Sequence, residues 1–307
     1  MEFTAISNQV LVLFILLVIG FILRKFDLMN DELNKGLSNL IIYVTLPALI
    51  ITSMNYEFSQ DKLNNSIKLL IIGFFIYIFM ILLSLLYTKI FHIEEPQRGV
   101  YQFLIIFANV GFMGYPIVEV IFGKIGVFYA AIYNLWFNII LWTLGIILIN
   151  PKHDKNINFK NLINPGTVSL LIGFIIFIFS IKLPQPIYVS LDRLGASTTP
   201  MAMLVVGSLL GDAKIGEIFT NKHLIITTLI RLIIIPAILI MGLSLFKLPD
   251  VVKGIPVVIG SMPAAANMAI FARKFNSDYR LASQGVFFTT LVSIGTIPLV
   301  IFMLLNF

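Results

Sequence analysis

The sequence predicts an all-α polytopic membrane protein with ten transmembrane helices, arranged as two inverted repeats of five. Three observations predict this fold. The 307 residues are 59% hydrophobic and only 12% charged, a composition that cannot build a water-soluble surface. Apolar runs of about twenty residues, the length that crosses roughly 30 Å of hydrocarbon, recur along the whole chain. Two of these runs are interrupted by proline and small residues at matching places in the two halves.

The apolar runs define ten expected spans. They cover residues 7–23, 37–54, 67–91, 100–122, 127–149, 167–181, 198–210, 224–246, 251–275 and 281–305. The seventh span is short, and the ninth begins with the polar stretch PDVVKGIP. Between the sixth and seventh spans, the segment PIYVSLDRLGAS fits either a short interfacial helix or an ordinary loop. The first run has span-like length and lacks a small-residue cleavage site, so we expect it to stay as a helix.

The positive charges indicate the orientation of these spans. Thirteen Lys and Arg residues fall in the loops after the odd-numbered spans, seven fall in the other loops or near the remaining span ends, and Arg231 lies within a span. The positive-inside rule therefore predicts that both termini lie outside and that the connector 150–165 is cytoplasmic. The net charge of +6 is explained by topology, and we expect no nucleic-acid partner.

The same connector divides the chain into two sets of five spans. An odd number of spans per set places the second set upside down relative to the first. Two pairs of prolines support the repeat: Pro47 and Pro200 are 153 residues apart, and Pro116 and Pro263 are 147 residues apart. Similar offsets are expected when one half repeats the other.

The interrupted spans carry the sequences NVGFMGYP (109–116) and GSMPAAAN (260–267). A proline in a helix leaves backbone N–H and C=O groups without hydrogen-bond partners. Such groups are costly in lipid unless they bind something else. In carriers with inverted repeats, such breaks face a shared cavity near the bilayer midplane. The alternative is two proline kinks packed by small residues. The expected substrate-binding residues are Asn109, Gly111, Gly114, Pro116, Pro263, Ala264 and Asn267.

Several further residues are candidates for substrate binding or ion coupling. Arg231 lies inside an apolar run and is expected to be a substrate counter-ion or a lock on a broken helix; snorkelling or pairing with backbone carbonyls is the alternative. Glu119 could couple transport to an ion or point to the outer face. Asn134 and Asn138 share one helix face, where they either line the cavity or bond between helices. Gln284, Thr289 and Thr290 are weaker candidates of the same kind.

Enzyme and metal chemistry find little support in the residues. The chain contains no cysteine, no HExxH or GxSxG motif and no aspartate well inside a span, so nucleophiles and metal ligands are lacking where they would be needed. We expect no enzyme activity, no cofactor and no metal site. An intramembrane enzyme or a channel remains the alternative class. Coupling to Na⁺ or H⁺ and uniport all stay open.

Four segments resemble the auxin efflux carrier family, which contains plant auxin exporters and bacterial malate-permease-type proteins. They are FANVGFMGYPIVEVIFG, MPAAANMAIFARKFNSDYRLASQGVFFTTLVSIGTIP, VTLPALI and LGASTTPMAMLVVGSLL, and together they run nearly end to end. The long cytoplasmic loop of some plant members is missing, because the connector 150–165 is short. Regulation through such a loop is therefore not expected.

The resemblance implies a fold of the bile-acid-symporter and NhaA type, with spans 4 and 9 crossing at Pro116 and Pro263 and with Asn109 beside the substrate. It also implies a scaffold domain (residues 1–65 and 151–220) and a transport domain (66–150 and 221–307) that shift against each other like an elevator. The implied function is secondary transport of a small organic anion across the plasma membrane by a homodimer in the lipid bilayer.

Overall fold

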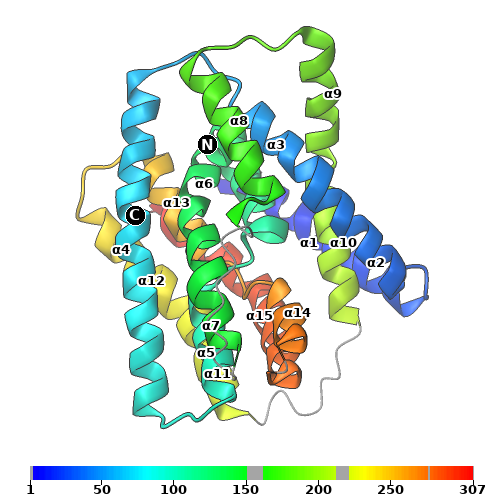
Figure 1. Cartoon of the computed structure of the whole chain (residues 1–307), viewed down its shortest axis with the longest axis vertical. Helices are drawn as coiled ribbons and strands as arrows, with labels where there is room; N and C mark the ends of the chain where they lie inside the picture. Colours follow the sequence, from blue (N-terminus) through cyan, green and yellow to red (C-terminus); the bar gives the residue numbers. More distant parts are fainter. Residues whose placement is uncertain (1–2, 151–161, 212–220, 276, 307) are drawn as a thin grey trace. The chain divides into compact units, whose positions relative to one another are not determined.

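The computed structural model describes residues 3–150, 162–211, 221–275 and 277–306. Every regular secondary-structure element in these ranges is a helix, and one β-bridge joins two isolated residues. The expectation of an all-helical chain is therefore confirmed for the described residues. Figure 1 shows the helices in chain order, from the blue α1 to the orange-red α15.

The α-helices differ widely in length, and short π-helical turns interrupt several of them. The α-helices are α1 (Phe3–Lys25), α2 (Asp31–Leu40), α3 (Leu46–Ser53), α4 (Gln60–Ile90), α5 (Gln97–Ile106), α6 (Tyr115–Ile140), α7 (Ile146–Ile149), α8 (Pro165–Ile178), α9 (Gln185–Ala196), α10 (Thr198–Gly211), α11 (Lys222–Leu229), α12 (Ile235–Ser244), α13 (Asp250–Gly260), α14 (Asn267–Lys274) and α15 (Tyr279–Asn306). The π turns are η1 (Ile41–Thr45), η2 (Val110–Gly114), η3 (Leu141–Gly145) and η6 (Ile230–Ile234).

Several helical stretches have the length and composition of membrane spans. Among the described residues, six qualify: Asp31–Ser53, Gln60–Ile90, Val110–Ile149, Gln185–Gly211, Lys222–Ser244 and Tyr279–Leu304. Each of the ten ranges expected from the sequence contains helix, although some are short or interrupted. The chain is therefore a multi-pass membrane protein, whereas the count of ten crossings and the inverted arrangement remain predictions.

The backbone decides two points that the sequence left uncertain. Within α6, Gly123 has φ 65° and ψ −160°, a conformation that glycine adopts much more readily than other residues. This break lies where the expected spans 100–122 and 127–149 separate. The segment PIYVSLDRLGAS is helical and forms most of α9, so the loop alternative is wrong, while its place at a membrane interface remains a prediction.

Three π turns end two residues before a proline. η1 precedes Pro47, η2 precedes Pro116 and η6 precedes Pro236. A proline has no N–H, and its ring crowds the carbonyl four residues earlier, so a regular α-helical turn would be strained at these places. A wider turn accommodates the misfit without ending the helix. The sequence therefore predicts a disturbance at each proline, but a helix that widens and continues is the outcome at these three.

The described chain separates into two compact units. The first contains Met1–Leu70, Gly111–Leu135 and Ile163–Asp212, and the second contains Ile71–Val110, Trp136–Leu162 and Ala213–Phe307. The units are defined by compactness alone, so the expected scaffold and transport domains remain predictions. The lysines of the connector between residues 151 and 161 lie outside the described residues.

In the first unit, α1 and α10 approach each other through glycines. A Cβ atom on Gly20 would lie 2.2 Å from the carbonyl oxygen of Leu204, and one on Gly207 would lie 1.9 Å from the carbonyl oxygen of Leu17. Each glycine thus faces the backbone of the other helix. Small residues at such contacts let membrane helices pack closely.

Gly207→Ala is therefore expected to destabilise the protein. The added methyl group must push α1 away, and overpacking of this kind costs about 1–3 kcal/mol. The measurement is the thermal midpoint of the protein in detergent, followed by size-exclusion chromatography. Gly36→Ala is the matched control because nothing lies within 4 Å of its added Cβ. An unchanged midpoint in Gly207→Ala would contradict the close contact of α1 and α10.

Candidate functional site

Two predicted spans are interrupted within the second unit. Residues 107–109 separate α5 from η2, and residues 261–266 separate α13 from α14. In the later segment, Pro263 disfavours the helical conformation of Met262 before it and has no N–H of its own. The helix of α13 therefore ends, and the chain becomes extended for a few residues before α14 begins.

The backbones of these two segments bond to each other. The Asn109 N–H donates to the Pro263 carbonyl at 2.8 Å, and the Ala265 N–H donates to the Phe107 carbonyl at 3.0 Å. Groups that the helices leave without partners are thus paired between segments far apart in sequence, as a low-dielectric interior requires. We call residues 107–109 together with 261–266 the crossing.

Two alanines lie at the centre of the crossing. Ala108 and Ala264 form an antiparallel β-bridge, and both are buried. Since the flanking residues make both hydrogen bonds, the alanines are a non-hydrogen-bonded pair, in which Cα atoms approach to about 4.5 Å.

Helix α15 supports the crossing with a hydroxyl group. The Ala264 N–H donates to Thr289 Oγ1 at 3.1 Å, and the same hydroxyl donates to the Gly285 carbonyl at 2.7 Å. Thr289 is fully buried. The threonine therefore gives a backbone N–H of the crossing a partner while its own hydrogen stays bonded within α15.

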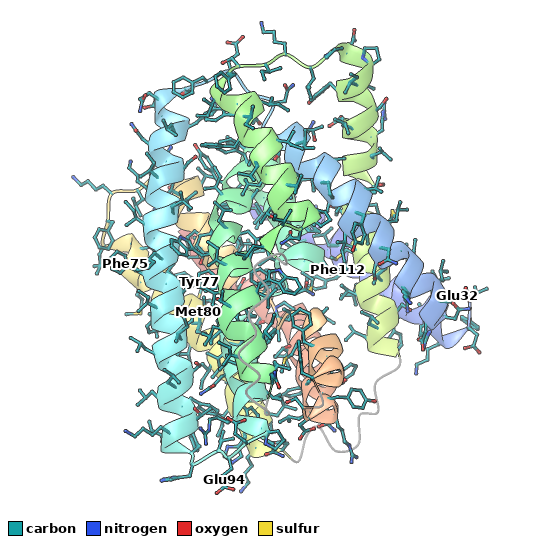
Figure 2. The ribbon with its side chains drawn as sticks, in the orientation of Figure 1. Glu32, Phe75, Tyr77, Met80, Glu94 and Phe112 are labelled. Atoms are coloured by element: carbon teal, nitrogen blue, oxygen red, sulfur yellow. The ribbon has the colours of Figure 1, made fainter. Side chains whose placement is uncertain are left out.

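Arg231 donates hydrogen bonds to both chain segments that meet at the crossing. Its Nε donates to the Met262 carbonyl at 3.1 Å, and its Nη1 donates to the Ile105 carbonyl at 3.0 Å. Nη1 also lies 3.5 Å from the sulfur of Met80, which Figure 2 labels on α4. The side chain is 0% exposed, so the snorkelling alternative is wrong, and pairing with backbone carbonyls is the observed arrangement.

The helix ends at the crossing are suited to charged groups. Helices α5 and α13 end there, and their carbonyl ends carry partial negative charge, which the Arg231 guanidinium complements. The turn η2 and helix α14 begin there, and the N–H groups of a helix start carry partial positive charge. A carboxylate or another small anion is the kind of ligand that such N-termini stabilise.

The structure places the expected substrate-binding residues unevenly. Asn109, Pro263 and Ala264 lie in the crossing, and Asn109 is only 4% exposed. Gly111 and Gly114 lie just after it in η2. Three of the seven expected residues therefore lie in the crossing, and two more lie among the five residues of η2 that follow it.

The position of the first interruption differs from the expected one. Pro116 is the second residue of α6 and lies seven residues after the extended segment ends, so the chain does not cross at Pro116 itself. The π turn η2 explains this, because it lets the helix pass through the proline. Asn267 is the first residue of α14, and its side chain is outside the part that the structure describes.

Glu119 lies in the first unit with polar neighbours on other helices. Its Oε2 accepts a hydrogen bond from Thr199 at the start of α10, at 3.0 Å. After the break at Gly123, Lys124 forms an ion pair with Asp192 of α9 and donates to Tyr188 Oη at 3.0 Å. Glu119 therefore faces α10. Its role in ion coupling stays a prediction.

The amide candidates on α6 and α15 have mixed surroundings. Asn134 Nδ2 donates to Tyr115 Oη at 3.2 Å, a contact within the first unit between the two parts of α6 on either side of the break at Gly123. Asn138 is half-buried one turn later, and Gln284 is half-buried beside Gly285 on α15. Among the described residues, no group of three His, Asp or Glu side chains is arranged to hold a metal ion.

Several contributors to the crossing carry no signal in the sequence. Backbone atoms rather than side chains take part at Ile105, Phe107, Ala108 and Met262. The side-chain types of these residues therefore do not indicate their role. Thr289 is one of the three weaker candidates that the sequence offers on α15, and its contact with Ala264 distinguishes it from the other two. One sequence feature could have located the extended segment: the small residue Ala108 stands directly before an asparagine within an apolar run.

Comparison with known proteins gives a family match over nearly the whole chain. The family model described as "Membrane transport protein" matches residues 5–158 and 154–301. An uncharacterized transporter of Methanocaldococcus jannaschii is 28% identical over 307 residues, which cover 97% of this chain and 99% of the relative.

Two similar proteins have more specific names. A putative malonate transporter of Rhizobium meliloti is 20% identical over 304 residues, covering 95% of this chain and 93% of the relative. Auxin efflux carrier component 8 of Arabidopsis thaliana is 27% identical over 141 residues, covering 45% of this chain and 38% of the relative. Transport is the common element in these names.

Proposed function

The chain belongs to the membrane transport protein family, and we propose that it is a secondary transporter that moves a small organic anion across the plasma membrane. The family is one of transport rather than enzyme catalysis, and the expectation that the chain is not an enzyme is confirmed by relatives named as transporters. The resemblance to auxin efflux carriers drawn from the sequence is likewise confirmed.

The observation that carries the proposal is the crossing. Two interrupted helices in one compact unit meet through their backbones, and two helical segments begin next to them. Their N-termini favour negative charge, and the small residues let the two backbones approach closely. Auxin and malonate, which appear in the names of relatives, are both carboxylic acids. Their carboxylates match this site.

The finer parts of the proposal follow the family resemblance. The ten helices form two inverted repeats, a transport domain shifts against a scaffold domain like an elevator, and the protein forms a homodimer with both termini outside. Glu119 is the one acidic residue well inside an expected span, which makes it the candidate for coupling to Na⁺ or H⁺. A coupled symporter and a uniporter are the two forms of the proposed function.

Flux measurements in proteoliposomes test the proposed function. We expect saturable uptake of radiolabelled malonate or indole-3-acetate, stimulated when the same anion is loaded inside, because a carrier exchanges substrate faster than it returns empty. Proton, sodium and potential gradients are imposed one at a time to identify the coupling. Single-channel current steps would instead indicate a pore, and absence of uptake for a wide panel of organic anions would refute an organic-anion carrier.

A further inference from the structure

We propose that Arg231 is a positioning residue that holds the two segments of the crossing in register, so that the crossing keeps the geometry that transport requires. This inference rests on the proposed function for its effect on transport. Its effect on the crossing itself is independent of any substrate and can be measured separately.

The first step is that one side chain connects three separate segments. The guanidinium donates from Nε to Met262, after α13, and from Nη1 to Ile105, in the last turn of α5, and it contacts Met80 on α4. All four residues lie within the second unit. The planar guanidinium holds donors in a fixed fork, so the positions of the two carbonyls are fixed relative to each other.

The second step concerns the carbonyls at the end of α5. A helix leaves its last carbonyls without partners inside the helix. Here the Phe103 carbonyl accepts from the Phe107 N–H, and the Phe107 carbonyl accepts from Ala265. The Ile105 carbonyl, which lies between them, accepts from Arg231. Arg231 therefore supplies a hydrogen bond in the series that closes this helix end.

The same series exists at the end of α13. The Ile259 carbonyl accepts from the Met262 N–H, and the Pro263 carbonyl accepts from Asn109. The Met262 carbonyl accepts from Arg231. Two broken helices thus each direct one carbonyl to the same guanidinium, which is an arrangement that neither break could satisfy alone.

The third step is that the local helix directs Arg231 to this place. Arg231 lies in η6, where the Ile235 N–H bonds to the Ile230 carbonyl five residues earlier. Pro236 follows directly, and its missing N–H explains the wide turn. Widened turns of this kind are frequent at functional sites, and this one contains Arg231. The proline and the arginine therefore work together to bring the cation to the crossing.

Cross-linking tests the positioning role without a substrate. The chain contains no cysteine, so the double variant Ala108→Cys, Ala264→Cys introduces a unique pair at a separation that a disulfide can span. We expect this pair to oxidise almost completely in detergent when Arg231 is present. With Arg231→Met, the cross-linking rate should fall by roughly tenfold, the scale of losing hydrogen bonds from a charged group.

Three companion variants separate positioning from general damage. Arg231→Lys keeps the charge but lacks the fork, so it should cross-link at an intermediate rate. Arg231→Gln serves if Arg231→Met fails to give monodisperse protein. Thr228→Val is the matched control: Thr228 is buried in the same span, and its hydroxyl donates to the Leu224 carbonyl of its own helix. Its cross-linking rate should equal that of the parent.

Uptake of malonate and of indole-3-acetate then links the geometry to transport. For the probe that the wild-type protein takes up, Arg231→Met should raise KM at least about tenfold, and Arg231→Lys should partly restore it. If wild type takes up none of a wide panel of organic anions while cross-linking still depends on Arg231, the positioning role stands and the proposed function fails. Cross-linking and KM that both stay at wild-type values in Arg231→Met and Arg231→Gln would overturn the positioning role.

Discussion

Pro263→Leu is expected to abolish uptake of the transported anion while the protein remains folded in detergent. Leucine brings back a backbone N–H and removes the restraint on Met262, so α13 can continue as helix through residue 263. A helix there withdraws the Pro263 carbonyl from the Asn109 N–H, to which it is bonded at 2.8 Å. The two segments then lose their pairing, and the helix starts at the crossing are displaced.

The measurement for this variant is initial uptake in proteoliposomes with equal amounts of reconstituted protein. Pro298→Leu is the matched control, because Pro298 lies inside α15 without ending it, and its replacement should leave uptake near the wild-type rate. Size-exclusion chromatography verifies that both proteins are monodisperse. Undiminished uptake in Pro263→Leu would show that the interruption of α13 is not needed for transport.

Asn109→Ala is expected to produce the second large loss of uptake. Asn109 is the polar side chain of the first interruption, and it is almost completely buried. Its amide can donate to a carboxylate, and a hydrogen bond to a charged group contributes about 1.5–3 kcal/mol. Loss of that contribution corresponds to at least about a tenfold drop in uptake at low substrate concentration.

The backbone bond of Asn109 to Pro263 survives this substitution, so the fold should not change. Thermal stability in detergent therefore stays close to the wild-type value while uptake falls. Asn65→Ala is a suitable control, since Asn65 is a half-buried asparagine of α4 that bonds weakly to Tyr129 at 3.5 Å. Equal uptake in Asn109→Ala and Asn65→Ala would remove Asn109 from the substrate site.

The interrupted helices show how far the sequence could lead. Pro263 marks its break correctly, because no widened turn precedes it and the chain becomes extended around it. Pro116 marks a place seven residues away from the actual break in the first half. The reason for the difference is local. The wide turn η2 accommodates Pro116 without ending the helix, whereas the extended residues 107–109 include no proline.

Arg231 is a second example of a residue whose contacts the sequence alone could not decide. Its position in an apolar run predicted a role in the membrane, but the sequence left snorkelling, carbonyl pairing and substrate contact open. The choice depends on which carbonyls lie within reach of the guanidinium. Those of Ile105 and Met262 come from segments far from Arg231 in the chain, so only the folded structure could identify them.

The sequence by itself determined that this chain is a helical membrane protein of a transport family. These properties follow from composition, from the length of apolar runs and from ordered motifs, which are all local features. The tertiary structure decided which backbone groups meet. The hydrogen bonds of Asn109 with Pro263 and of Phe107 with Ala265 join main-chain atoms, which every residue carries in the same form. Side-chain patterns cannot specify such pairs, and only the three-dimensional approach of the two segments does so.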